Sequence, residues 1–170
     1  MSIQLWDRMY PEDEIQRIES LVIVNDRYEK FFTKRRKEWN EELEPLFKSI
    51  FRGNFTMNNS REIVDAQASV LSLRQRCNDR ISYYAQKMSK VKSENAIISQ
   101  QKFLFYSTGF GLKTNLGEKK MLIDGHLREN IRQSDIIEIH LNFLKETSDN
   151  LNSWNFAIKN IIQIIEYLGK

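Results

Sequence analysis

The chain has 170 residues, of which 41% are hydrophobic and 29% are charged, so it has enough apolar residues for a buried core and falls outside the composition of disordered chains. Its six glycines and two prolines are too few for the many tight turns of an all-β or α/β domain, and we therefore expect an all-α fold of a few long helices. The 26 basic and 23 acidic residues give a formal net charge of +3, which alone selects no class of partner.

Cysteine content and hydropathy bear on the cellular compartment. Cys77 is the single cysteine and cannot form a disulfide within the chain. The first 16 residues are acidic where a signal peptide is apolar, and no run of 18 apolar residues occurs. We expect a soluble, cytoplasmic protein that does not bind membranes.

The first predicted element is a helix over residues 12–52, starting near Pro11, with a break or kink at Pro45. Lys34 and Lys37 each precede a glutamate by four residues, which favours a solvated helix face, with contact to phosphates as the alternative. A polar connector containing Gly53 follows, and Ser60 is a plausible start of the next helix.

Residues 62–106 contain neither Gly nor Pro and predict one long helix. Nine of its positions alternate by four and three residues, which indicates a packing seam. These positions are Cys77, Ile81, Tyr84, Met88, Val91, Asn95, Ile98, Lys102 and Phe105. The polar members Asn95 and Lys102 either fix the register of the seam or, at Lys102, direct an ammonium group toward a ligand.

A loop is expected over residues 107–117, which hold three of the six glycines. The surrounding segment from Arg80 to Lys120 has eight basic and two acidic residues, a local balance of +6. The loop lacks the pattern of a phosphate-binding loop, so we do not expect nucleotide hydrolysis.

Beyond Gly125 the sequence is helical in pattern, with a second heptad seam that includes Ile137, Leu141 and Leu144. Between Ile158 and Leu168 seven of eleven residues are apolar, more than one helix face needs. This excess predicts either burial against another subunit or an ordinary core helix. The predicted oligomerisation residues are Leu151, Ile158, Ile161, Ile162, Ile165 and Leu168.

Catalytic and metal-binding patterns are weak. His126 and His140 are the only histidines, and although Asp124 and Glu138 lie nearby, single surface histidines are common. Cys77 on a heptad seam is typical of a small core residue rather than a nucleophile. We expect no enzyme activity, no metal and no cofactor.

Basic and aromatic residues alternate at the end of the second helix and in the loop after it. Cations neutralise phosphates and aromatic faces stack bases, so this pattern favours binding of single-stranded nucleic acid. The alternative is that the aromatic residues close the end of a helix. The candidate DNA-binding residues are Lys102, Lys113, Lys119, Lys120, Phe105 and Tyr106.

The segment from Lys102 to Gly109, KFLFYSTG, resembles a region of the UvsY family of phage recombination mediators, in which basic residues precede paired aromatics, a Ser and a Gly. The run from Leu151 to Ile161, LNSWNFAIKNI, is similar to the closing helix of that family and is the more specific of the two motifs. The resemblance covers roughly residues 60–168. Lys102 matches one DNA-contacting basic position of the family, and the uncharged Gln100 stands at the other.

The resemblance implies a recombination mediator that binds single-stranded DNA as a ring-like homo-oligomer and does not hydrolyse ATP. It would help to load a RecA-like recombinase in place of single-strand-binding protein, in the host cytoplasm if the chain is phage-encoded. We expect residues 1–58 to form an N-terminal helical arm and residues 59–170 to form the mediator-like core. The alternative is a coiled-coil structural or adaptor protein, for instance of a virion, that binds protein and no DNA.

Overall fold

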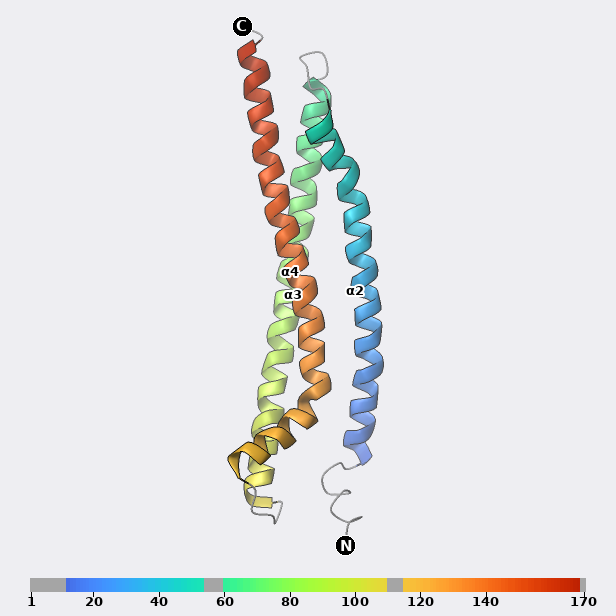
Figure 1. Cartoon of the computed structure of the whole chain (residues 1–170), viewed down its shortest axis with the longest axis vertical. Helices are drawn as coiled ribbons and strands as arrows, with labels where there is room; N and C mark the ends of the chain where they lie inside the picture. The colour runs from blue at the N-terminus through green and yellow to red at the C-terminus, as the bar shows by residue number, and fades with distance from the viewer. Residues whose placement is uncertain (1–11, 54–59, 110–114, 169–170) are drawn as a thin grey trace. The chain divides into compact units, whose positions relative to one another are not determined.

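The computed structural model describes residues 12–53, 60–109 and 115–168. It confirms the all-α fold: three long helices, α2 (Glu12–Arg52), α3 (Ser60–Leu104) and α4 (Leu116–Leu168), follow one another, and the described part of the chain contains no strand (Figure 1). A short π-helix, η2 (Phe105–Gly109), continues α3 at its carboxyl end. None of the described helices carries an apolar stretch that would span a bilayer.

The bounds of the first two helices agree closely with those expected from the sequence. The helix predicted over residues 12–52 is α2, which begins with Glu12, Asp13 and Glu14, the acidic residues that favour a helix N-terminus. Pro45 lies inside α2 and does not end it. The start expected at Ser60 is also confirmed, since α3 begins there.

The predicted loop over residues 107–117 is shorter than expected. Ser107 and Gly109 belong to η2, where Thr108 Oγ1 donates to the carbonyl oxygen of Leu104 over 2.8 Å. At the other end, α4 begins at Leu116 and includes Gly117 and Gly125. Residues 110–114, including Lys113, lie outside the described part of the chain.

The chain divides into two compact units, each of which takes a part of all three helices. Unit 1 comprises Met1–Phe31 and Lys87–Glu138, and unit 2 comprises Phe32–Gln86 and Ile139–Lys170. The expected arm of residues 1–58 and core of residues 59–170 stay a prediction. The helix α2 belongs to both units because its side chains pack with α3 and α4 in each.

Unit 2 has an apolar core built from the predicted seams. Cys77 on α3 and Leu144, Leu151 and Ile158 on α4 are fully buried. The helix α2 adds Phe32, whose ring stacks on His140 with centroids 4.3 Å apart. The Cys77 thiol donates to the carbonyl oxygen of Leu144 over 3.0 Å, and burial raises its pKa to about 11, so it is a core residue and not a thiolate nucleophile.

Unit 1 joins α2 to α4 mainly through polar contacts. The amide of Asn25, fully buried, donates to the carbonyl oxygen of Glu129 over 2.8 Å. Arg132 donates to Asp26 over 2.7 Å and to Glu29 over 3.1 Å. These contacts position the amino-terminal half of α2 against the segment that carries the predicted DNA-binding residues.

Candidate nucleic-acid interface

Apart from Lys113, which lies outside the described residues, the predicted DNA-binding residues lie in unit 1, where the end of α3, the helix η2 and the start of α4 meet. Ile123 and Leu127 of α4 and Tyr106 of η2 form the buried core of this region. Phe105 is partly buried against that core. Two of the six residues therefore belong, wholly or in part, to the interior that holds the region together.

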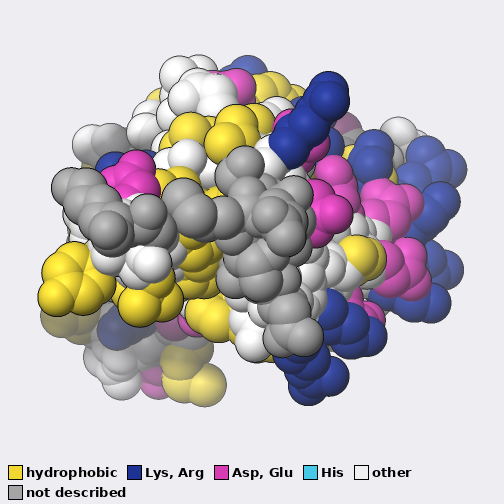
Figure 2. All heavy atoms as spheres, turned by 90° about the horizontal axis from the view of Figure 1, so that it is seen from above, with side chains coloured by type: hydrophobic (Ala, Val, Ile, Leu, Met, Phe, Trp, Pro, Cys, Tyr) yellow, Lys and Arg dark blue, Asp and Glu magenta, His cyan; other side chains and the backbone are white. Residues whose placement is uncertain are grey.

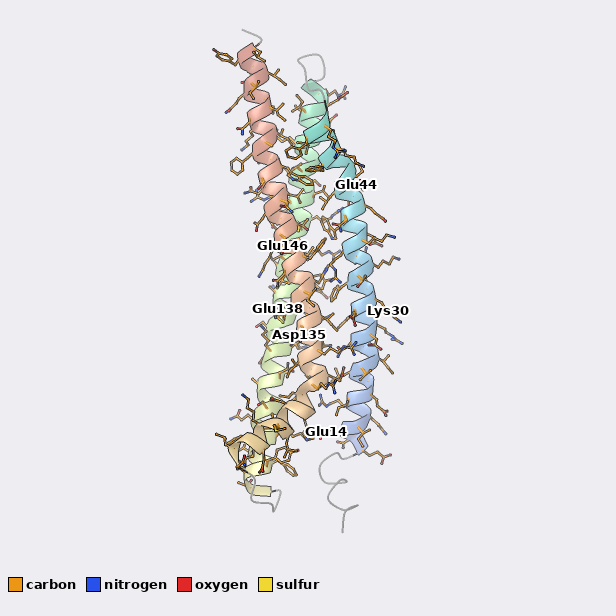
Figure 3. All side chains as sticks on the ribbon, viewed as in Figure 1. Glu14, Lys30, Glu44, Asp135, Glu138 and Glu146 are labelled. Atoms are coloured by element: carbon orange, nitrogen blue, oxygen red, sulfur yellow. The ribbon has the colours of Figure 1, made fainter. Side chains whose placement is uncertain are left out.

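Lys102 points into the protein rather than toward solvent. Its Nζ lies 2.5 Å from Oε2 of Glu14, on the first turn of α2, and the two side chains are 20% and 10% exposed. Glu14 is labelled in Figure 3, near the amino-terminal end of α2. Of the two roles considered for Lys102, the structure shows a packing position, in which the ammonium is neutralised by a carboxylate of the same chain.

His126 extends this ion pair into a buried chain of four side chains. Its Nδ1 lies 3.0 Å from Oε1 of Glu14, and its Nε2 is bonded to the Tyr106 hydroxyl. A carboxylate can only accept, so Nδ1–H donates to Glu14 and the Tyr106 hydroxyl donates to Nε2 of the neutral imidazole. We call Lys102, Glu14, His126 and Tyr106 the buried relay.

The charge state of His126 agrees with this assignment. Burial lowers the pKa of His126, and the nearby Lys102 ammonium lowers it further, while the Glu14 carboxylate opposes both effects. The imidazole is therefore neutral at pH 7. Because each member of the relay is bonded to another member, the relay joins α2, α3, η2 and α4.

Tyr106 is 1% exposed, so no base can reach either face of its ring in this conformation. The exposed aromatic side chain next to Lys102 in the chain is instead Phe103, which is 42% exposed and is not among the predicted residues. The ammonium of Lys119 lies 5.9 Å from the Phe103 ring centroid and 3.3 Å from Oγ of Ser107. Lys120, next in the chain, is exposed.

Several lysines of α3 and α4 have no acidic partner, unlike Lys34, Lys37 and Lys48 of α2. Within the described residues, no ion pair involves Lys90, Lys92, Lys119 or Lys120. On α2, by contrast, lysines and arginines alternate with glutamates, and their pairs are Lys34–Glu38, Arg35–Glu38, Lys37–Glu41 and Lys48–Glu44. Figure 2 shows this alternation as dark blue and magenta side chains on the right of the view. The exposed pairs of Lys34 and Lys37 agree with the solvated face expected at these positions of α2.

Phe103 and Lys92 share one face of α3, because eleven residues make close to three helical turns. We group these two residues with Lys119 and Lys120 under the name basic–aromatic strip. Sequence reasoning named only the two α4 lysines of this strip. Phe103 is not predicted from the sequence because several aromatic residues follow one another there. Periodicity alone does not separate the exposed ring from the buried ones.

The predicted oligomerisation residues divide into three groups. Leu151 and Ile158 are fully buried in the core of unit 2, so they are not available to another subunit. Ile161, Ile162 and Ile165 are partly buried. Leu168 is 77% exposed.

Neither histidine lies in a metal-binding cluster. Within the ranges that the structure describes, no group of three or more His, Cys, Asp or Glu side chains could hold a metal ion. His126 is held by Glu14 and Tyr106, and His140 lies between the rings of Phe32 and Tyr84.

Comparison with known proteins gives no relative: no protein-family model, no curated protein and no solved structure matches the chain.

Proposed function

We propose that the chain is a homo-oligomeric recombination mediator that binds single-stranded DNA through the basic–aromatic strip. The proposal rests first on one observation: an exposed phenylalanine, Phe103, lies beside Lys119, a cation without an acidic partner in the described chain. It rests second on the resemblance of residues 60–168 to the UvsY family. On this proposal the protein has no enzyme activity and needs no cofactor.

The strip supplies the two interactions that single strands require. Stacking of a base on an exposed aromatic ring contributes about 1–3 kcal/mol, and it tolerates any base. Lys92, Lys119 and Lys120 would neutralise phosphates and release counterions. The buried relay contributes indirectly, because it fixes the end of α3 and the start of α4 that carry the strip.

Each subunit offers a small site, so we propose that strong binding comes from repetition. A homo-oligomer, a ring in the resembling family, presents the strip once per subunit at high effective concentration along one strand. The partners implied are a RecA-like recombinase and single-strand-binding protein. The mediator would hold the strand while the recombinase takes the place of single-strand-binding protein.

The proposal is tested by fluorescence anisotropy with a labelled single-stranded oligonucleotide at several salt concentrations. Lys119→Ala combined with Lys120→Ala removes two phosphate contacts and should make the log–log salt slope shallower by about 1.4. Phe103→Ala should weaken binding by about 5-fold to 150-fold and leave the slope unchanged, because stacking releases no counterions.

The matched control is Lys34→Ala combined with Lys37→Ala, which removes the same net charge from α2. These side chains are 77% and 78% exposed and lie beside Glu38 and Glu41, so we expect the salt slope to stay unchanged. An equal effect of both double variants would contradict a defined site. If the unmodified chain does not bind the oligonucleotide at low salt, the protein-binding adaptor becomes the better description.

A further inference from the structure

The last five turns of α4, in unit 2, expose a stripe that takes no part in the core. The core seam runs through Leu151, Asn155 and Ile158, all buried. On another face Phe156 is 57% exposed and Tyr167 81% exposed, with the exposed Asn160 and Gln163 between them. We call Phe156, Asn160, Gln163 and Tyr167 the terminal stripe.

The terminal stripe has the spacing and composition of a helix-pairing surface. Its members follow one another at four, three and four residues, the heptad pattern of a coiled coil. A shallow groove of about 460 Å³ runs along it, lined by Asn160, Gln163, Ile164, Tyr167 and Leu168. Figure 2, which looks onto the end that carries the C-terminus, shows hydrophobic side chains gathered beside the end of α4.

We propose that the terminal stripe binds the terminal stripe of a second copy of this chain, with the two helices antiparallel. The order of side chains is aromatic, amide, amide, aromatic, so it is the same in both directions. With a two-fold axis midway between Asn160 and Gln163, Asn160 faces Gln163 of the second copy. Phe156 then faces Tyr167 of the second copy, and each contact occurs twice.

Charges beside the stripe favour the antiparallel orientation. Lys159 and Glu166 are the only charged residues between positions 150 and 169, and both are exposed. Each directly precedes a stripe residue, and in an antiparallel pair the residues at these positions face each other across the interface. Lys159 would therefore pair with Glu166 of the second copy, twice, whereas a parallel pair would place Lys159 beside the uncharged Ile164.

At the other edge of the terminal stripe the two copies would be complementary in side-chain size rather than in charge. Ala157 and Ile164 each directly follow a stripe residue, and Ile164 is 58% exposed. In the antiparallel register, Ile164 lies opposite Ala157 of the second copy, so a large side chain meets a small one. Within the chain, Lys159 Nζ lies 5.8 Å from the Phe156 ring centroid, which shows that this cation is already beside the stripe.

This inference gives the homo-oligomer of the proposed function, on which it rests, one defined contact. A two-fold contact closes on itself and produces a dimer, so a ring would need a further surface in addition. The residues involved are separate from the basic–aromatic strip, which belongs to unit 1. Self-association and nucleic-acid binding can therefore be disrupted separately.

Charge reversal tests the register. We expect Lys159→Glu and Glu166→Lys each to raise the dimer dissociation constant about tenfold, measured by analytical ultracentrifugation, because each variant places like charges together twice. The double variant Lys159→Glu with Glu166→Lys should restore association to within about threefold, since the same pairs form with exchanged signs. An unmodified chain that stays monomeric, or a double variant as weak as the single ones, would overturn the proposal.

Cross-linking provides a second test that does not depend on charge. Asn160→Cys and Gln163→Cys chains, mixed and mildly oxidised, should form disulfide-linked dimers faster than either variant alone. The native Cys77 is fully buried and serves as the same background in every sample. Faster linking of Asn160→Cys with itself would indicate a parallel pair and refute the proposal.

The oligonucleotide assay on Lys159→Glu separates this inference from the proposed function. A short oligonucleotide that occupies one strip should bind this variant with the salt slope of the unmodified chain, although the dimer is weakened. Loss of the slope in a variant that is still folded would show that the terminal stripe itself contacts nucleic acid, contrary to the proposal.

Discussion

Two buried histidines occupy different environments. His126 is hydrogen-bonded at both ring nitrogens within the buried relay. His140 is 2% exposed, stacks on Phe32, and has an Nδ1 atom without a hydrogen-bond partner among the described residues. Burial and the nearby Arg36 charge lower the pKa of His140 to about 4. His140 is therefore the side chain whose protonation conflicts most directly with the fold.

The sign of the pH effect follows from this lowered pKa. Below the ordinary value of about 6.5 the unfolded chain binds a proton at this position that the folded chain does not, so acidification favours unfolding. We expect His140 to reduce the free energy of unfolding by about 3 kcal/mol as the pH falls from 7 to 4. His126 acts in the same direction, since its pKa is also lowered. Urea denaturation across this pH range measures the loss.

The control is His140→Phe, which keeps an aromatic ring against Phe32 and removes both the titrating group and the unpaired nitrogen. This variant should be about as stable as the unmodified chain at pH 7, within about 1 kcal/mol. Its free energy of unfolding should also depend less on pH. Superimposable pH profiles for the two proteins would show that His140 does not limit stability in acid.

At the scale of elements, the start of α4 is set by a reciprocal cap. The backbone N–H of Glu118 donates to Oδ1 of Asn115 over 2.8 Å, and the Asn115 N–H donates to Oε2 of Glu118 over 2.9 Å. These two bonds form a capping box, which stabilises the first turn of a helix. They explain why α4 begins at Leu116, inside the segment that sequence reasoning assigned to a loop.

Removing this cap should destabilise the fold without altering its core. We expect Asn115→Ala to lower the free energy of unfolding by about 1 kcal/mol, because the Glu118 N–H loses its side-chain acceptor. Thermal denaturation followed by circular dichroism measures the change. Asn115→Ser, which can still cap, should recover most of the loss. If both variants match the unmodified chain, the cap is not what holds the helix start.

The sequence predicted the elements better than the site, for a physical reason. Helix bounds depend mainly on residues close in sequence, so the scarcity of glycine, the heptad spacing and Ser60 are enough to place α2 and α3. The helix α4 begins at Leu116, before the start expected beyond Gly125. Asn115 and Glu118 also carry a local signal, a capping pair three residues apart, of which Asn115 falls within the predicted loop. The buried relay joins Glu14 to residues 88 and 112 positions away, and no local pattern encodes such a contact.

At the scale of the whole molecule, the small net charge hides a separation of two kinds of surface. The ion pairs of α2 are exposed, and exposed pairs contribute little to stability. The lysines of the basic–aromatic strip have no acidic partner in the described chain, so they are available to an external anion. Salt should therefore affect binding far more than folding.

This separation predicts different effects of salt on oligonucleotide affinity and on the free energy of unfolding, both measured in the same buffers. A tenfold increase in salt should weaken oligonucleotide binding at least about 25-fold, if two phosphates are contacted. Over the same range the free energy of unfolding, from urea denaturation, should change by less than about 1 kcal/mol. A parallel fall in both quantities would show that salt acts on the fold and not on a nucleic-acid contact.

The contribution of α2 to both units limits how the chain can be dissected. Deleting residues 1–58 would remove Glu14 from the buried relay and the buried Phe32, Trp39 and Ile50 from unit 2. In the remaining fragment Lys102 would lack its carboxylate partner, and the apolar faces of α3 and α4 that α2 covers would be exposed. A loss of oligonucleotide binding in this fragment would therefore reflect misfolding rather than the loss of a binding residue. Point substitutions on the solvent side of α2 are therefore the way to assign it a role.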